Sequence, residues 1–396
     1  MSDSHMRLAL RLARRGYGTT SPNPMVGAVL VKGGRIIGRG WHRRAGEPHA
    51  EVEALRDAQA RGHAVKGATL YVTLEPCCTQ GRTPPCTEAI VAAGIKRVVA
   101  GAVDPNPRHR GRGFRILQRA GVAVTRGLMA EECARLNEAF NHWIVRGTPL
   151  VTVKAAMTLD GKIATAAGES KWITGEQARA YAMKLRQGTD AILVGINTVL
   201  ADDPSLTFRN PKAETRRAKE VRSPKSEVRS GDAGWRQPQD EAEGSRLRRI
   251  VLDARARTPL GAKVVNDEWA VLTTVVVGAS APKQRVAALA NRVRVLIAPS
   301  ANQKINLRWV LAKLGAENVT SLLVEGGGEV NASFLLQGLA QRVMFFYAPM
   351  ILGGRDSRRA VAGKGATTLA ETVSLTKLEW QRLGPDWLLN ARVKPH

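Results

Sequence analysis

The stretch HAEVEALRDAQARGHAVKGATLYVTLEPCCTQGRTPPC, residues 49–86, decides the fold and the chemistry of the first part of the chain. It starts with a helical pattern opened by Pro48, a residue that suits the first helical position, so we expect His49 and Glu51 in the opening turn. The apolar segment 68–74 (ATLYVTL) predicts a strand. A turn rich in Pro and Cys follows, and Cys86 then precedes a second helical run.

Three side chains of this stretch form the donor set of a catalytic zinc site. His49, Cys77 and Cys86 offer one imidazole and two thiolates, which leaves a fourth position for water, whereas a structural site would be closed by four protein ligands. At a helix N-terminus, backbone amides and the helix dipole would favour the thiolate of Cys86. Glu51 is the expected general acid/base, because a carboxylate beside zinc can carry a proton from the water to a departing amine. Histidine, glutamate and Pro-Cys in this order match the zinc deaminase signature.

The other two cysteines have different interpretations. Cys78 is predicted to be a packing residue, because adjacent cysteines on a tight turn point apart; ligand exchange at the zinc is the alternative. Cys133, in the helical pattern AEECARLNEAF, is predicted to lie in the core. Four cysteines in 396 residues do not indicate a disulfide framework, and their clustering favours metal binding in a reducing compartment, so we expect a cytoplasmic protein.

Strand and helix patterns alternate on both sides of this stretch. The segment 23–41 has two strand-like runs around Gly33 and Gly34, which is a hairpin signal. The alternation continues for about 145 residues and predicts a sheet with helices on both faces. A new strand pattern begins at Leu150, so we place the boundary near Gly147, with a first domain at 1–147 and a second at 148–396.

The second domain repeats the α/β pattern and ends in an edge hairpin, predicted at 378–393 from two runs hinged at Gly384 and Pro385. One segment differs. Residues 210–249 are crowded with charged and small residues and nearly lack aliphatic ones, which predicts a flexible insertion. A nucleic-acid-binding arm is the alternative, but acidic residues are interleaved throughout the segment.

The segment SLLVEGGGEVNASFLLQGL, residues 321–339, carries a second candidate site. A strand ends at Glu325, three glycines follow, and a helix with Val330 and Phe334 on one face starts at once. Glycines let the backbone approach a ligand closely, and the free N–H groups of the helix start suit phosphates. A simple tight turn is the alternative, and the G-x-G-x-x-G fingerprint of dinucleotide-binding proteins is missing.

Composition sets wider limits. The chain is 44% hydrophobic and 24% charged, which fits a folded protein, and no apolar run approaches the roughly 20 residues that cross a bilayer, so we expect no membrane partner. The net charge of +26 would suit an anionic partner. Up to Thr148 there are 23 Lys and Arg against 11 Asp and Glu, and beyond it 37 against 23, so the excess is spread over both halves and forms no basic tail.

Several motifs resemble one enzyme family. The spacer of eight residues between Cys77 and Cys86, together with SPNPMVGAVLV, HAEVEAL, VTLEPCC, TPPC and DPNP, resembles the pyrimidine deaminase of riboflavin biosynthesis. VKAAMTLDGKIATAAGESKWIT, LVEGGGEV and YAPMILGG resemble the reductase half of the same bifunctional family. The resemblance implies a cytidine-deaminase-like α/β/α domain followed by an α/β domain similar to dihydrofolate reductase. Where many members have His two residues after the first cysteine, this chain has Thr79.

The resemblance also implies the reactions and the binding residues. Zinc-dependent deamination of 2,5-diamino-6-(5-phosphoribosylamino)pyrimidin-4-one would be followed by NADPH reduction of the ribosyl group to ribityl. By the resemblance, the expected NADPH contacts are Ala156, Trp172, Thr198, Asp202, Gly327, Gly328, Glu329, Val330, Asn331, Ala332 and Ser333. The expected substrate contacts are Asn23 in the deaminase and Ser170, Arg186, Leu206, Arg209 and Glu325 in the reductase, with Arg186 and Arg209 as partners of the phosphate.

Partners follow from this interpretation. We expect one zinc ion per chain, NADPH, a phosphorylated pyrimidine, no nucleic acid, and a homo-oligomer, through the reductase domain. Two alternatives stay open at the level of sequence. A tRNA or single-stranded DNA deaminase would explain the positive charge, and a zinc-stabilised nucleic-acid-binding protein would predict a closed metal site.

Overall fold

The structure is a computed structural model, and it describes residues 2–81, 84–208, 247–301 and 304–395. The chain divides into two compact units, each with its own β-sheet. Unit 1 comprises Met1–Leu150 and Leu311–Ser321, and unit 2 comprises Val151–Val310 and Leu322–His396. The 147/148 boundary expected from the sequence stays a prediction.

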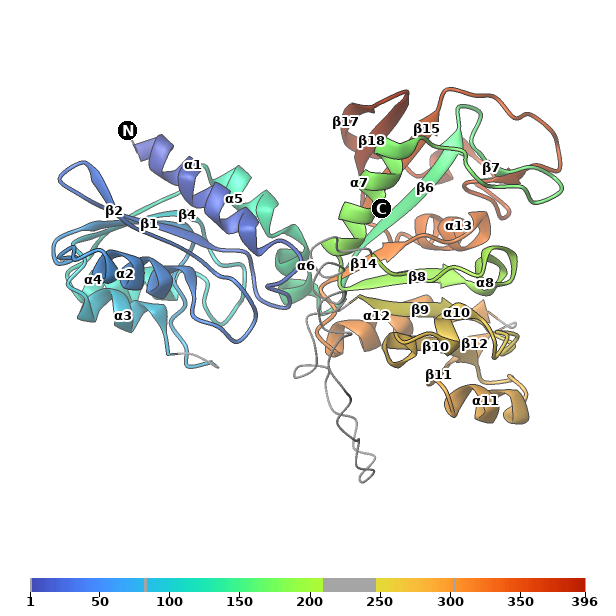
Figure 1. The fold of residues 1–396 in the computed structure, drawn as a ribbon, viewed down its shortest axis with the longest axis horizontal. Coiled ribbons are helices and arrows are strands. Elements are labelled where there is room, and N and C mark those ends of the chain that lie inside the picture. The colour runs from blue at the N-terminus through green and yellow to red at the C-terminus, as the bar shows by residue number, and fades with distance from the viewer. Residues whose placement is uncertain (1, 82–83, 209–246, 302–303, 396) are drawn as a thin grey trace, which may run out of the picture. The chain divides into compact units, whose positions relative to one another are not determined.

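The sheet of unit 1 has five strands in the order β2-β1-β3-β4-β5 (Figure 1). β1 is antiparallel to both β2 and β3, whereas β3, β4 and β5 are parallel. The bounds are β1 Gly27–Lys32, β2 Arg35–Trp41, β3 Thr69–Leu74, β4 Arg97–Ala102 and β5 Ala123–Arg126. Gly33 and Gly34 connect β1 to β2 with positive φ angles of 56° and 75°, as the predicted hairpin requires.

Helices cover both faces of this sheet. In Figure 1, α1 and α5 lie on one face, and α2, α3 and α4 lie on the other. The bounds are α1 Ser2–Ala13, α2 Ala50–Ala60, α3 Cys86–Ala92, α4 Arg112–Arg119, α5 Ala130–Leu136 and α6 Glu138–Arg146. The α/β/α arrangement expected for the N-terminal half is therefore confirmed.

Two glycines of β2 set how closely α2 approaches the sheet. A Cβ atom at Gly38 would collide with the carbonyl oxygen of Ala54, and one at Gly40 would collide with the carbonyl oxygen of Ala50. Because both obstacles are helix backbone, no side-chain adjustment could relieve them. The start of α2 is thus fixed against the sheet, and the fully buried Ala50, Ala54 and Ala58 fill the contact.

The sheet of unit 2 has nine strands in the order β11-β10-β9-β8-β14-β6-β15-β18-β17. Neighbouring strands are parallel from β11 to β8, between β8 and β14, and between β6 and β15. At the other end of the sheet, β18 is antiparallel to both β15 and β17. The bounds are β6 Leu150–Thr158, β8 Ala191–Gly195, β9 Arg248–Leu252, β10 Thr273–Gly278, β11 Arg294–Ala298, β14 Ser321–Val324, β15 Arg342–Ala348, β17 Leu375–Leu383 and β18 Asp386–Val393. The predicted edge hairpin corresponds to β17 and β18.

The remaining elements of the second half connect or cover these strands. The short strands are β7 Lys162–Ala164, β12 Ser300–Ala301, β13 Lys304–Ile305 and β16 Arg358–Arg359. The helices are α7 Glu176–Gln187, α8 Ile196–Asp202, α10 Lys263–Asn266, α11 Lys283–Ala290, α12 Leu307–Ala316 and α13 Gly328–Leu336. Within the described ranges, no helix is long and apolar enough to cross a membrane.

Two expectations need correction. α2 begins at Ala50, so His49 is its N-cap residue with extended backbone angles (φ −74°, ψ 165°), and only Glu51 lies in the first turn. The predicted insertion 210–249 extends too far, because β9 starts at Arg248 and the side chain of Arg249 is fully buried. Its guanidinium donates to both carboxylate oxygens of Asp267, at 2.6 and 2.7 Å. Because Asp267 is distant in sequence, the composition of residues 210–249 could not reveal this partner. Most of the predicted insertion, 210–246, lies outside the described residues.

Candidate functional site

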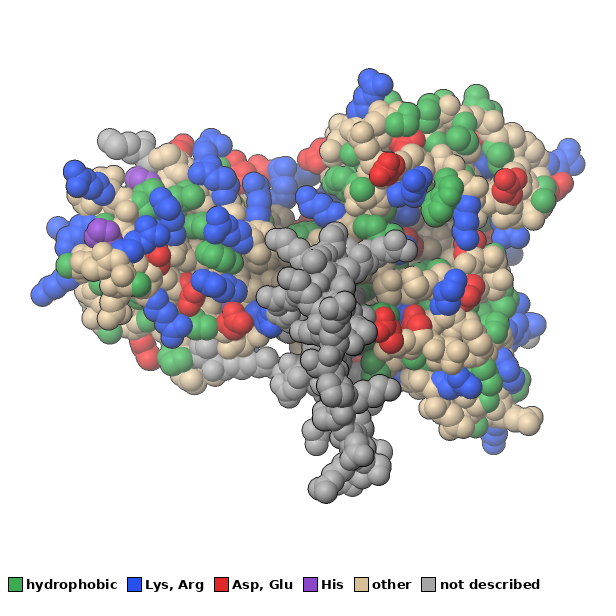
Figure 2. All heavy atoms as spheres, in the orientation of Figure 1, with side chains coloured by type: hydrophobic (Ala, Val, Ile, Leu, Met, Phe, Trp, Pro, Cys, Tyr) green, Lys and Arg blue, Asp and Glu red, His purple; other side chains and the backbone are tan. Residues whose placement is uncertain are grey.

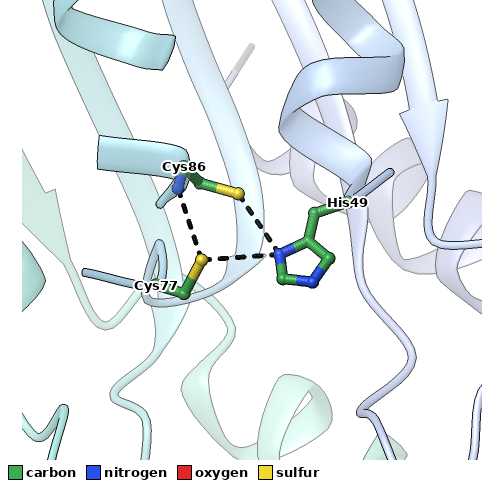
Figure 3. Close-up of side chains that lie close together, drawn as sticks. All are labelled: His49, Cys77 and Cys86. Atoms are coloured by element: carbon green, nitrogen blue, oxygen red, sulfur yellow. Dashed lines mark hydrogen bonds between the residues drawn. The ribbon is translucent and has the colours of Figure 1, made fainter. Parts of the chain in front are cut away.

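His49, Cys77 and Cys86 come together from three separate elements of unit 1 (Figure 3). His49 caps α2, Cys77 lies in the loop after β3, and Cys86 is the first residue of α3. His49 Nδ1 is 3.4 Å from Cys77 Sγ and 3.3 Å from Cys86 Sγ, and the three donor atoms all lie within 4.8 Å of one another. The sequence therefore identified a cluster that the fold assembles.

Backbone contacts hold the Cys77 segment against the start of α3. The N–H of Cys86 donates to Cys77 Sγ at 3.3 Å, and the N–H of Thr87 donates to the carbonyl oxygen of Cys77 at 3.2 Å. The hydrogen bond with the Cys86 side chain, together with that to His49, lowers the pKa of Cys77 to about 4. A thiolate is the form in which cysteine binds a metal.

The donor set fits zinc. In a tetrahedral site with zinc–sulfur bonds of about 2.3 Å and zinc–nitrogen bonds of about 2.0 Å, sulfur and nitrogen ligands lie about 3.5 Å apart. The two observed nitrogen–sulfur distances are close to this value. One imidazole and two thiolates leave a fourth position for a small molecule, which distinguishes this set from a closed structural site.

Glu51 lies beside the cluster and is not one of its three donors. Its side chain is in hydrogen-bond contact with Cys86, and the residue is only 3% exposed. Burial raises the pKa of Glu51 to about 7, so this carboxyl group can both accept and release a proton near neutral pH. That property suits the expected general acid/base.

A second imidazole, His42, borders the same region, and no sequence motif indicates it. Asn23 Nδ2 lies 3.2 Å from His42 Nε2, and His42 Nδ1 lies 3.2 Å from the carbonyl oxygen of Pro48. A neutral His42 ring satisfies both contacts, since Nδ1–H donates to Pro48 and Nε2 accepts from Asn23. Burial lowers the pKa of His42 and favours this neutral form. The ring meets His49 edge-on with centroids 5.2 Å apart, so Asn23 is connected to the cluster through His42.

Two cysteines lie outside the metal-ligand cluster. Cys78 is half-buried and is not among the three grouped donors, while Cys133 is fully buried in the core of unit 1. The core position predicted for Cys133 is therefore confirmed.

Gly326, Gly327 and Gly328 form the turn between β14 and α13 in unit 2, and only Gly327 has space beside it for another atom. A Cβ atom at Gly326 would lie 2.6 Å from Val330 Cβ, and one at Gly328 would collide with the carbonyl oxygen of Arg359. At Gly327 the nearest side-chain atom would be Thr198 Oγ1, at 4.0 Å. Gly327 is the N-cap of α13, whose first turn has N–H groups without intrahelical acceptors. The turn thus brings Gly327 and Thr198 together around an accessible helix N-terminus.

A buried carboxylate directly precedes this turn. Arg186 Nε and Nη2 donate to the two oxygens of Glu325, each at 2.9 Å, and Lys154 Nζ lies 3.5 Å from Oε2. Burial alone would raise the pKa of Glu325, but the charges of Lys154 and Arg186 outweigh it and lower the pKa to about 2. Arg186 Nη1 also donates to the carbonyl oxygen of Thr207 at 3.0 Å, so the predicted phosphate partner already has three protein acceptors.

The other predicted contacts in unit 2 differ in accessibility. Ser170 Oγ donates to Asp202 at 3.4 Å, and Trp172 is 72% exposed beneath the Arg179 guanidinium, 4.7 Å from the ring centre. Ala156 and Ser333 are half-buried, and Glu329 accepts from the N–H of Gly363 at 3.1 Å. By contrast, the side chains of Leu206, Asn331 and Ala332 are buried. Arg209 lies outside the described residues.

Comparison with known proteins agrees with this geometry. The family described as the cytidine and deoxycytidylate deaminase zinc-binding region matches residues 1–102, and the RibD C-terminal domain matches residues 149–389. The fold and the site thus define a zinc-binding, cytidine-deaminase-like domain joined to a dihydrofolate-reductase-like reductase domain. The chain belongs to the RibD family of bifunctional riboflavin-biosynthesis deaminase/reductases.

Similarity to the relatives extends over the whole chain. The riboflavin biosynthesis protein RibD of Actinobacillus pleuropneumoniae is 40% identical over 98% of this chain and 94% of its own length, and that of Aquifex aeolicus is 42% identical over 98% and 97%. The solved structure of Acinetobacter baumannii RibD is 35% identical, has a TM-score of 0.81 and covers 99% of both chains. The deaminase/reductase structure from Thermotoga maritima is 32% identical, with a TM-score of 0.78 and the same coverage.

Removing one donor of the cluster should remove the metal. We expect Cys77→Ala and His49→Ala to lose zinc on dialysis, because two protein ligands remain, whereas Cys78→Ser should keep about one zinc per chain. Elemental analysis of the purified variants measures this. Zinc at the wild-type level in Cys77→Ala would contradict the ligand assignment.

The ion pairs of Glu325 should give unit 2 a defined pH dependence. The folded-state pKa of this carboxyl is lowered, so its stabilising contribution is fully present above about pH 4.5 and is lost as the pH falls toward 2. Glu325→Gln should therefore lower the unfolding temperature at pH 7 and lower it less at pH 3. At neutral pH we expect the substitution to reduce the free energy of unfolding by about 3 kcal/mol. Equal decreases of the unfolding temperature at the two pH values would contradict the prediction that Glu325 is ionised and paired.

Proposed function

We propose that the chain carries out two successive reactions on one phosphorylated pyrimidine. Unit 1 deaminates 2,5-diamino-6-(5-phosphoribosylamino)pyrimidin-4-one, and unit 2 reduces the ribosyl group of the product with NADPH to give 5-amino-6-(5-phosphoribitylamino)uracil. The observation that carries the proposal is the His49–Cys77–Cys86 cluster with the buried Glu51 beside it. For the domain limits we propose 1–147 and 148–396.

In the deaminase reaction, His49, Cys77 and Cys86 hold the zinc ion. Zinc, when bound, lowers the pKa of water toward neutrality and so supplies the nucleophile. Glu51 takes one proton of the attacking water and gives it to a ring nitrogen, then takes the second proton of that water and gives it to the amine, which leaves as ammonia; its pKa near 7 permits both transfers. Atoms balance, because one water enters the reaction and one ammonia leaves.

The substrate pocket of the deaminase includes Asn23. Its amide nitrogen is directed to His42 by their hydrogen bond, which leaves the amide oxygen to face a pyrimidine edge. The neutral His42 donates a hydrogen bond to Pro48, which directly precedes His49 in the chain. The wall of the pocket and the metal ligand therefore belong to one connected group.

In the reductase reaction, NADPH supplies the hydride that reduces the ribosyl C1. The segment from Gly327 to Ser333 contacts the cofactor, and the free backbone N–H groups at the very start of α13 bind its phosphates, with Ala156, Trp172, Thr198 and Asp202 as further contacts. The side chains of Asn331 and Ala332 are buried and the N–H of Asn331 donates to the carbonyl oxygen of Gly327 at 3.1 Å, so these two residues would support the helix start from inside.

The substrate of the reductase meets Ser170, Arg186, Leu206, Arg209 and Glu325 in this proposal. Glu325 remains ionised at neutral pH and offers acceptors to the hydroxyl groups of the sugar. Leu206 would act through its backbone, because its side chain lies in the core of unit 2.

We also propose that the protein is cytoplasmic and forms a homo-oligomer through unit 2. A hollow of about 580 Å³ on this unit is lined by Leu159, Tyr347, Ala348, Pro349, Trp380 and Trp387. Trp380 and Trp387 are 55% and 46% exposed, and Trp380 lies on the edge strand β17. Exposed aromatic groups of this kind mark protein interfaces.

Replacing the proposed general acid/base should separate the two reactions. Glu51→Gln is expected to reduce ammonia release at least 10²-fold while zinc stays bound, because the amide cannot transfer the proton. NADPH oxidation with the deaminated pyrimidine as substrate should stay at the wild-type rate. Ammonia release at the wild-type rate would refute the role of Glu51, and loss of NADPH oxidation would refute two independent sites.

An interface on unit 2 should depend on its exposed tryptophan. Trp380→Glu is expected to shift the protein toward monomers in analytical ultracentrifugation, since a charge would be buried in an apolar contact. Val271→Glu, a matched change at a residue that is 76% exposed elsewhere in unit 2, should leave the distribution unchanged. A wild-type protein that is already monomeric would contradict the oligomer.

A further inference from the structure

A second loop supports the segment that carries Cys77. Loop 104–113 follows β4 and includes the first two residues of α4, and the loop with Cys77 follows β3. Because β3 and β4 are parallel neighbours, both loops leave the same edge of the sheet. Thr79 Oγ1 forms a hydrogen bond of 2.9 Å with His109 Nε2. This contact joins the two loops two residues beyond Cys77.

Asp104 lies beside the other ring nitrogen of His109, Nδ1. Asp104 Oδ2 lies 3.4 Å from His109 Nδ1, and the two side chains are only 8% and 14% exposed. The second oxygen of Asp104 accepts the N–H of Asn106 at 2.9 Å, which fixes the carboxylate within its own loop. Asp104 favours a proton on Nδ1 and thereby raises the pKa of His109. A hydroxyl can either donate to Nε2 or accept from it, so the Thr79 contact persists in both protonation states.

Glu75 makes the corresponding connection on the other side of Cys77. Its buried carboxylate accepts the N–H groups of Asp104 at 3.2 Å, Gly111 at 2.9 Å and Gly113 at 3.0 Å. Cys77 therefore lies between two residues, Glu75 and Thr79, that are each bonded to the loop 104–113. A third contact to the Cys77 segment comes from the start of α3, where the N–H groups of Cys86 and Thr87 donate to Cys77.

We propose that His109 is a positioning residue of the deaminase site. It acts through Thr79 to fix the Cys77 segment in the geometry that the metal requires, and Asp104 orients its ring. The inference rests on the proposed zinc-dependent deamination. Removing a side chain that orients a metal ligand without binding the metal itself typically lowers metal affinity or activity 10- to 100-fold.

The proposal is tested with a double-mutant cycle on the full-length protein. Thr79→Val keeps the shape of the side chain and removes its hydroxyl, His109→Ala removes the ring, and Thr79→Ser retains the hydroxyl. Thr125→Val is the matched control, since Thr125 in β5 accepts a hydrogen bond from Arg97 far from the ligands. Zinc affinity is measured by chelator competition, and kcat and KM are measured by ammonia release.

We expect Thr79→Val and His109→Ala each to weaken zinc binding about tenfold or more and to lower kcat at full zinc loading with little change in KM. The double variant should be no worse than either single variant, because both break the same contact. Thr79→Ser and Thr125→Val should behave like the wild type.

The proposal would be overturned by unchanged zinc affinity in both single variants or by additive losses in the double variant. A rise in KM with unchanged kcat would also overturn it, because it would place His109 at the substrate. A loss of thermal stability alone, with wild-type affinity and kcat, would also overturn it. Failure of the proposed deamination is recognised separately, because the wild type would then release no ammonia while the zinc measurements still test the positioning role.

Discussion

The close contact between α2 and β2 is the constraint on which the deaminase half depends. Backbone meets backbone at Gly38 and Gly40, so the start of the helix has one position relative to the sheet. That position puts His49 at the carboxyl edge of β3, where Cys77 and Cys86 complete the cluster. A metal site needs its ligands within a few tenths of an ångström, and rigid packing of helix on sheet supplies this precision better than flexible loops could.

Much of this arrangement was predictable because its signals are local. Residue types and spacing at 49–86 predicted the zinc ligands, and the patterns of strands and helices predicted both α/β sheets and the terminal hairpin. What could not be predicted depends on contacts between distant segments. His42 and His109 lie outside the sequence motifs, and their roles follow from Asn23 and Thr79, which only the fold brings near. The pairing of Arg186 with Glu325 and of Arg249 with Asp267 is equally non-local.

The positive charge has a limited connection with function. Figure 2 shows Lys and Arg side chains interspersed with Asp and Glu over the visible surface of both units. At the candidate sites the cations serve specific partners: Arg186 and Lys154 neutralise a single carboxylate, Glu325. A phosphorylated substrate and NADPH require few of the remaining charges, so we interpret the net charge of +26 as a property of the whole surface.

Two sites in one chain that act in a fixed order can be separated by measuring NADPH oxidation before and after zinc removal. The reaction is started either with the diaminopyrimidine phosphate or with its deaminated product. We predict that zinc removal abolishes NADPH oxidation from the first substrate and leaves oxidation from the second unchanged. Equal rates from the first substrate with and without zinc, or loss of both activities together, would contradict it.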